Sequence, residues 1–249
     1  MNIILIDPEE VSATNTVTLH DRRLGHIRKV LRSNTGDTVR IGLVNGMIGT
    51  GVIDELSRDR AILHIKADTP PPAKKPIDLI LALPRPIMLK RILAQAASFG
   101  VARIFLINAN RVEKSFFNAT LLAPDNLTDC LRQGLEQGVD TILPELSVHP
   151  RFRPFVEDLL PPIAASCHIR LVAHPDTDLH LDQAAPQMAG KRSLLAIGPE
   201  GGWVDFEIER FREQGLIPFT LGPRILRMDT AVPALLAQID LLGRLPAQP

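Results

Sequence analysis

The sequence predicts an α/β protein in which a small, mostly β module precedes a larger domain of alternating strands and helices. The first seventy residues carry short strand patterns, and a proline-dense stretch, TPPPAKKP (69–76), follows them. After that stretch, apolar strand candidates alternate with helical patterns, which is typical of a mainly parallel sheet with helices on both faces. We therefore expect a module over 1–70, a linker over 71–76 and an α/β domain over 77–249.

The N-terminal module has one helix among its strands. Its strand candidates are Asp37–Leu43, Gly46–Leu56 and Arg60–Ala67, with a hairpin signal at Asn45-Gly46. The helix is expected over about 22–31, where Leu24, Ile27 and Leu31 share one face. These elements indicate a small barrel-like module that bears a basic helix.

Basic residues concentrate on that helix. The segment RRLGHIRKVLR (22–32) holds five Lys and Arg residues and no acid. Such a face can attract phosphates, or it can be the solvated side of an amphipathic helix. The segment alone leaves both interpretations open.

The larger domain is expected to contain six strands and five helices. The strand candidates are Ile77–Leu83, Ala102–Asn108, Ile142–Val148, Ile169–Ala173, Leu194–Ile197 and Ile217–Leu221. The helices are expected at about Ile87–Phe99, Leu121–Gln137, Phe152–Leu160, Asp205–Gln214 and a last helix that Thr230 can cap. Its apolar stripe (Leu235, Leu236, Ile239, Leu242) is explained either by burial against the sheet or by a dimer seam.

Bulk properties exclude several classes of protein. The 249 residues have a formal net charge of zero, which argues against a protein that coats nucleic acid indiscriminately. No apolar stretch is long enough for a bilayer, no signal peptide is evident, and the two cysteines lie far apart, so a cytoplasmic protein is expected. The seven histidines lack metal-ligand spacing, so no metal is expected.

Two loops near the C-terminus carry the strongest functional signal, LLAIGPEGGW (194–203) and LGPRILRMDTA (221–231). Each follows a strand candidate, and loops at strand carboxyl ends line the ligand crevice of an open α/β sheet. Gly198, Gly201, Gly202 and Gly222 let backbone amides approach a ligand closely. GPEGGW matches neither usual phosphate-binding motif, and Glu200 would repel a polyphosphate. A cofactor without phosphates is favoured, and S-adenosylmethionine fits physically.

At this spacing the two loops resemble the SPOUT superfamily of knotted RNA methyltransferases. Within it, the chain is most similar to the family that methylates N3 of a uracil in 16S ribosomal RNA of the small subunit. HIRKVLR (26–32), ALPRP with Arg85, and NANRVEK with Arg111 extend the resemblance. It implies a trefoil-knotted α/β domain, an N-terminal PUA-like β-barrel that binds RNA, S-adenosylmethionine as cofactor, and a homodimer.

The chain departs from the family pattern at several positions. MLKR (88–91, with Met88) and SFG (98–100, with Ser98) replace the usual Lys-Met-Glu and Glu-Leu-Gly. Asp140 stands where an arginine is expected, and Val204 replaces a serine, so Asp205 can take over as helix N-cap. These departures affect the RNA side more than the cofactor loops.

Roles follow from the chemistry of N3 methylation, which requires loss of the N3 proton while charge spreads onto the flanking carbonyl oxygens. Arg227 is the first choice to stabilise that charge, and Glu200 and Asp229 are candidate proton acceptors. Asp229 could instead only cap the last helix, and Trp203 could pack in the core or stack on a ligand. The expected cofactor-binding residues are Ala173, Ile197, Gly198, Pro199, Gly201, Gly202, Leu221, Gly222, Ile225, Leu226, Thr230 and Ala231. The expected RNA contacts are Arg22, Arg23, Arg28, Lys29, Arg32, Arg85, Arg111 and Arg224.

The sequence thus predicts an S-adenosylmethionine-dependent 16S rRNA (uracil-N3) methyltransferase. Two rival interpretations remain at this point. One is a SPOUT methyltransferase that acts on another rRNA or tRNA site, and the other is a non-catalytic RNA-binding assembly factor.

Overall fold

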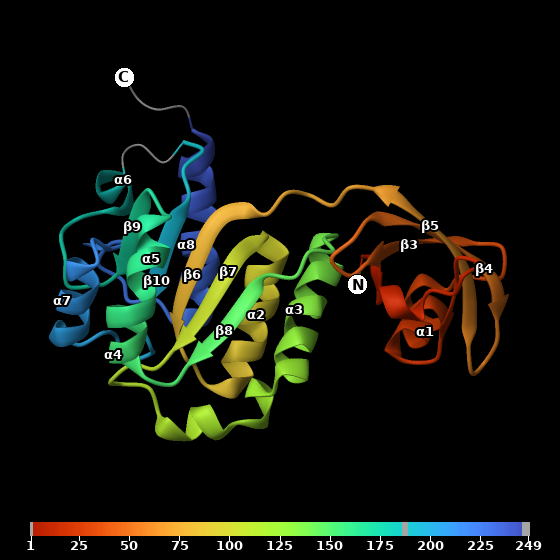
Figure 1. Cartoon of the computed structure of the whole chain (residues 1–249), viewed down its shortest axis with the longest axis horizontal. Helices are drawn as coiled ribbons and strands as arrows, with labels where there is room; N and C mark the ends of the chain where they lie inside the picture. The colour runs from red at the N-terminus through yellow and green to blue at the C-terminus, as the bar shows by residue number, and fades with distance from the viewer. Residues whose placement is uncertain (1, 186–188, 246–249) are drawn as a thin grey trace. The chain divides into compact units, whose positions relative to one another are not determined.

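The computed structural model describes residues 2–185 and 189–245, which form two compact units (Figure 1). One unit comprises Met1–Ala73 with Leu131–Leu143, and the other comprises Lys74–Cys130 with Pro144–Pro249. Within the described residues, no helix has both the length and the apolar character needed to cross a bilayer.

The first unit is built on a five-stranded sheet in the order β1-β3-β4-β5-β2. The strands are β1 (Ile4–Ile6), β2 (Thr16–Leu19), β3 (Thr38–Leu43), β4 (Ile48–Leu56) and β5 (Ala61–Thr69), and a 3-10 turn, η1, covers Pro8–Glu10. β1 pairs with β3 in parallel, and the other pairs are antiparallel. The hairpin at Asn45-Gly46 is confirmed, since Gly46 N–H donates to the Leu43 carbonyl between β3 and β4. Alternating apolar residues of the sheet form the core, where Ile6, Leu19, Ile41, Ile53 and Leu63 are fully buried.

The basic helix differs in part from its prediction. α1 (Arg22–His26) runs directly into a π-helical turn, η2 (Ile27–Leu31), and the chain leaves it at Arg32 with φ of 54°. Leu24 and Ile27 are buried as expected, but Leu31 is 45% exposed. The expectation for Leu31 was wrong because a wider π turn shifts later residues off the 3.6-residue period.

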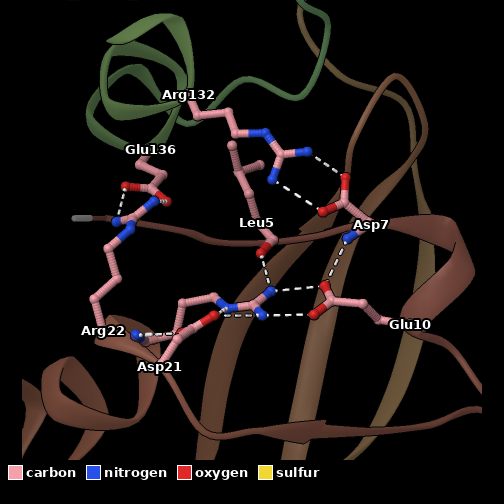
Figure 2. A network of polar contacts seen from close by, with 8 residues as sticks. Leu5, Asp7, Glu10, Asp21, Arg22, Arg132 and Glu136 are labelled. Carbon is pink, nitrogen blue, oxygen red and sulfur yellow. Dashed lines mark hydrogen bonds and ion pairs between the residues drawn. The ribbon is translucent and has the colours of Figure 1, made fainter. Parts of the chain in front are cut away.

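Three arginines of the first unit are held by carboxylates (Figure 2). Arg22 Nη2 lies 2.6 Å from Glu136 Oε1, and Arg132 pairs with Asp7 through both terminal nitrogens. Arg23 is 8% exposed and donates to Glu10, to Asp21 and to the Leu5 carbonyl. Burial opposes the charge of Arg23, but the bonds to Glu10 and Asp21 outweigh burial and raise its pKa.

The second unit contains a six-stranded sheet in the order β11-β9-β10-β6-β7-β8, and every neighbouring pair is parallel. The strands are β6 (Lys75–Ala82), β7 (Val101–Ile107), β8 (Glu145–His149), β9 (Ile169–Ala173), β10 (Ser193–Ile197) and β11 (Ile217–Phe219). Figure 1 shows α5 in front of this sheet and α8 behind it. The predicted strands are confirmed, with shifts of one to three residues at most of their ends.

The helices of the chain also follow the predicted alternation. They are α2 (Pro86–Phe99), α3 (Pro124–Gly138), α4 (Phe152–Pro154), α5 (Leu160–Ala165), α6 (Leu181–Ala184), α7 (Asp205–Glu213) and α8 (Met228–Arg244), with shorter turns η3 (Lys114–Asn118), η4 (Thr120–Leu122) and η5 (Phe155–Leu159). α8 begins at Met228 after Arg227 as N-cap, so Thr230 lies inside its first turn and does not cap it. Its stripe residues Leu235, Leu236 and Ile239 are buried.

A buried carboxylate joins three segments of the large sheet. Asp78 on β6 is fully buried, and its oxygens lie 2.6 Å from Arg103 Nη2 and 2.7 Å from Arg192 Nη2. Arg103 belongs to β7, and Arg192 directly precedes β10. Burial disfavours the ionised Asp78 carboxyl, but the two arginine hydrogen bonds prevail and lower its pKa. The thiol of Cys167 also donates to Asp78, and both cysteines are buried and unpaired, as expected of structural thiols.

Candidate active site

A cavity of about 510 Å³ opens where the parallel strands of the second unit end. Because the strands run in the same direction, the loops after β6, β9, β10 and β11 meet at one edge of the sheet. These loops contribute Arg85, the segment Ala173–Pro175, the segment Ile197–Trp203 and the segment Phe219–Met228. The structure thus brings together the two glycine-containing loops that the sequence singled out.

Nearly all of the expected cofactor-binding residues line this cavity. They are Ala173, Ile197, Gly198, Pro199, Gly201, Gly202, Leu221, Gly222, Ile225, Leu226 and Ala231. Thr230 is not among the lining residues, although Met228 and Ala231 of the same first turn of α8 are. Its expected contact with the cofactor stays a prediction.

Glycines in these loops occupy positions where a side chain would strain the backbone or collide with a neighbour. Gly202 and Gly222 have φ of 75° and 112°, values that side-chain-bearing residues rarely adopt. A Cβ at Gly198 would lie 3.1 Å from Nε1 of Trp203, whose indole packs against this glycine. Trp203 is buried and edge-on to Phe211, with ring centroids 5.0 Å apart, so it supports the loop from the core while bordering the cavity.

The cavity suits an organic molecule with both apolar and hydrogen-bonding parts. Its volume falls in the range of small-molecule sites, and its walls combine aliphatic side chains with backbone groups. Ile225 is 83% exposed and Leu226 is 38% exposed at its rim, so a ligand can cover apolar surface there. Glu200 adds a carboxylate, which tolerates a cationic sulfonium better than a phosphate. These features fit S-adenosylmethionine.

Charged groups gather at the same cavity. Arg85 Nε lies 3.3 Å from Glu200 Oε2, so an ion pair joins the loops after β6 and β10. Arg227 Nε lies 3.7 Å from Asp229 Oδ1, and the Arg227 side chain is 79% exposed. Asp229 does not line the cavity, whereas Glu200, Arg224 and Arg227 do. Arg227 is therefore exposed at the cavity, with the Asp229 carboxylate beside it.

Comparisons with known proteins agree with this geometry. Residues 71–240 match the RNA methyltransferase domain family. The chain is 30% identical over 242 residues to ribosomal RNA small subunit methyltransferase E of Treponema pallidum, covering 96% of this chain and 90% of the relative. It is 28% identical to the protein of the same name from Synechocystis, covering 96% of this chain and 77% of the relative.

The chain belongs to the RNA methyltransferase family. This confirms the family that the two loops resemble. Solved structures of similar fold include a putative methyltransferase of Legionella pneumophila in complex with S-adenosylmethionine, with a TM-score of 0.76 and 23% identity over 98% of this chain and 99% of that one. Another is ribosomal RNA small subunit methyltransferase E of Neisseria gonorrhoeae bound to S-adenosylmethionine, with a TM-score of 0.74 and 22% identity over 96% of this chain and 98% of that one.

The arginines predicted to contact RNA have different surroundings in the methyltransferase. Arg85 and Arg224 line the cavity. Arg111 instead donates from Nη1 to the Gly201 carbonyl. In the first unit, Arg22 pairs with Glu136, and Arg23 is buried among carboxylates. Arg23 is buried with its donors bound, so it has little left for a phosphate, whereas the Arg22 side chain is 52% exposed and its contact with RNA stays a prediction.

The later residues of the basic segment are free of such pairing. Arg28, Lys29 and Arg32 are exposed, and none forms an ion pair with the part of the chain that the structure describes. Arg28 Nη1 donates to the carbonyl of Arg58, a further exposed arginine that the sequence did not indicate. Val30, between them, is 66% exposed.

Several other residues differ from their prediction or were not predicted at all. Val204, not Asp205, is the N-cap residue of α7, and Glu207 supplies the capping carboxylate. Asp140 is buried, and its Oδ1 accepts from the amides of Thr141 and Ile142. His174 lines the cavity without having been predicted, since a lone histidine after a strand carries no motif. No group of three or more His, Cys, Asp or Glu suited to a metal ion occurs over 2–185 and 189–245.

Proposed function

We propose that this chain transfers a methyl group from S-adenosylmethionine to N3 of a uracil in 16S ribosomal RNA of the small subunit. One observation carries the proposal: in a chain of this family, a single cavity unites both glycine-containing loops with Glu200 and Arg227. The names of the relatives from Treponema pallidum and Synechocystis support ribosomal RNA of the small subunit as substrate. The two fold neighbours that hold S-adenosylmethionine support the cofactor.

The backbone of the two loops would hold the cofactor. Residues 198–202 and 221–226 offer amides and carbonyls, while Ile225 and Leu226 offer apolar cover. When bound, S-adenosylmethionine supplies an electrophilic methyl group on a sulfonium. Glu200 faces the same cavity, and its carboxylate is compatible with that positive charge.

Residues at the rim would carry out the proton and charge chemistry. Glu200 would accept the N3 proton, which would leave the N3 electron pair free to take the methyl group that the sulfonium would give up. The Arg227 guanidinium donates to a uracil carbonyl oxygen, where negative charge gathers as the proton leaves. Asp229 orients Arg227, and Arg85 orients Glu200. The target base has to leave its stack to reach this site.

The first unit is proposed to be a PUA-like β-barrel domain that binds RNA through its π turn. Arg28, Lys29 and Arg32, together with Arg58 and the exposed Val30, form what we call the turn surface. Phosphates would bind the cations, and an unstacked base would cover the exposed valine. Arg23 would stabilise the fold of this unit, and Arg22, exposed beside Glu136, stays a candidate RNA contact.

The remaining features are proposed from the family. The domain division at 1–70, 71–76 and 77–249 stays a proposal, although Leu131–Leu143 belong to the first compact unit and β6 begins at Lys75. A trefoil knot formed by threading of the C-terminal segment is also proposed. The protein is proposed to be a cytoplasmic homodimer whose cofactor site lies near the interface.

Methyl transfer tests the function directly. Purified protein, labelled S-adenosylmethionine and small subunits from a strain that lacks this protein should give a single labelled uracil in 16S RNA, with the methyl group on N3. Label on a ribose, on another base or on transfer RNA would redirect the proposal, and cofactor binding without transfer to any RNA would refute catalysis.

A further inference from the structure

A buried carboxylate fastens two loops that are distant in the sequence. Glu207 is 2% exposed and is the third residue of α7. Its Oε2 accepts the Val204 N–H at 3.0 Å, and its Oε1 accepts the Asn110 N–H at 2.6 Å. The first bond caps α7 after the loop 198–204, and the second reaches the loop that follows β7.

Arg111 provides a second tie between the same two loops. Its Nη1 donates to the Gly201 carbonyl, and its aliphatic part packs on Gly201, where a Cβ would lie 3.0 Å from Arg111 Cδ. The loop after β7 is itself anchored, because the Asn108 side chain donates to the Pro150 carbonyl at 3.1 Å and its N–H donates to the His149 carbonyl at 3.0 Å. The cavity loop is therefore attached to the loop after β7 at Gly201, through Arg111, and at Val204, through Glu207.

We infer that Glu207 and Arg111 are positioning residues that hold the loop 198–204 in its cofactor-binding shape. The inference rests on the proposed function of that loop. The N-cap residue Val204 has no side-chain acceptor. The carboxylate of Glu207 therefore caps α7 by accepting the Val204 N–H. A buried carboxylate that loses either amide partner is costly, which couples the two loops. Neither residue lines the cavity, so both act through the backbone they hold.

Calorimetric titration with S-adenosylmethionine tests whether Glu207 and Arg111 hold the loop. Glu207→Gln keeps one carbonyl acceptor for two amides, and we expect its Kd to rise about tenfold. Arg111→Ala should raise Kd severalfold. In the double variant the two effects should combine to less than their product, because both residues hold the same loop. Glu209→Gln, at an exposed position on the same helix, is the matched control and should leave Kd unchanged.

Two further readouts separate positioning from loss of fold. At saturating cofactor, Glu207→Gln should still reach the binding stoichiometry of the parent, whereas single-turnover methyl transfer should slow, because the proton acceptor Glu200 lies in the loop that Glu207 holds. Hydrogen exchange at the Asn110 and Val204 amides should accelerate, while exchange in β6 should not. Parent-like Kd in Glu207→Gln, or a lower binding stoichiometry with parent-like Kd, would overturn the inference. Failure of the parent to bind S-adenosylmethionine would instead refute the proposed cofactor site.

Discussion

Gly222 and His174 show how single residues set the properties of the cavity. At Gly222 the backbone turns with φ of 112°, a conformation that a side chain would strain. His174 lines the cavity wall and is 9% exposed. Burial lowers the pKa of its imidazole below the ordinary 6.5; Asp176 and Asp205 oppose this shift, and Arg212 adds to it. The ring is therefore neutral at pH 7.

We predict that cofactor affinity falls on acidification because of His174. Between pH 7 and 8.5 the ring stays neutral, so affinity should be level. As pH falls below 6.5 and through the lowered pKa, the ring gains a positive charge that disfavours a bound sulfonium. The unfolded chain takes up this proton more readily, so stability falls in the same range.

Calorimetric titration across pH 5.5–8.5 checks this prediction. The His174→Gln variant should lose most of the decline in affinity below pH 6.5. Superimposable pH profiles for parent and variant would assign the decline to another group.

Glycines and isolated polar residues differ in how well the sequence predicts them. Gly198, Gly201, Gly202 and Gly222 follow strand patterns at a recognisable spacing, so their place in the cavity was predictable. Glu207 and His174 were not, because their importance comes from contacts with segments brought near by folding. Glu207, for example, bonds to an amide 97 residues away.

At the scale of elements, apolar periodicity predicted most of the strands. It did not predict which arginines are ion-paired, because their partners lie far away in the sequence. Arg22 and Glu136 are 114 residues apart, so no local pattern distinguishes this arginine from a free one. β1 and β2, of three and four residues, were not predicted.

The ion-paired carboxylate of Asp78 should stabilise the large sheet. Asp78→Asn leaves two arginines without their carboxylate, and we expect a loss of about 3 kcal/mol in the free energy of unfolding at pH 7. The lowered pKa of Asp78 means that its stabilisation is present above the ordinary value of 3.8 and is lost as pH falls through the folded-state value. Denaturant unfolding should therefore show a gap between parent and variant that narrows below about pH 4. A gap under 0.5 kcal/mol at pH 7 would contradict this account.

The turn surface should dominate RNA binding by the first unit. Replacing Lys29 and Arg32 with alanine removes two phosphate contacts, so the slope of log affinity against log salt should flatten by about 1.5. Lys66→Ala is the matched control, since Lys66 is exposed on β5 but already paired with Asp68. Filter binding of 16S RNA fragments at several salt concentrations measures the slopes. Equal slopes for the double variant and the control would remove the turn from the interface.

At the scale of the whole molecule, the open question is whether the chain forms a dimer, because the apolar stripe of α8 could pack on the sheet or on a second copy. The buried residues Leu235, Leu236 and Ile239 account for most of the stripe, while Leu241 is 48% exposed near its end. We predict a homodimer, which light scattering at micromolar concentration should report as about twice the 27.4 kDa chain mass. A monomer that methylates RNA at the full rate would refute a site that depends on the dimer.

The central claim is that Arg227 stabilises charge on the uracil during methyl transfer from a cofactor held by the neighbouring loops. Single-turnover transfer to small ribosomal subunits, at saturating S-adenosylmethionine, tests it most directly. We predict that Arg227→Ala lowers the rate constant about a hundredfold or more while the cofactor Kd changes less than threefold. An Arg227→Ala variant that transfers the methyl group at the parent rate would contradict the account.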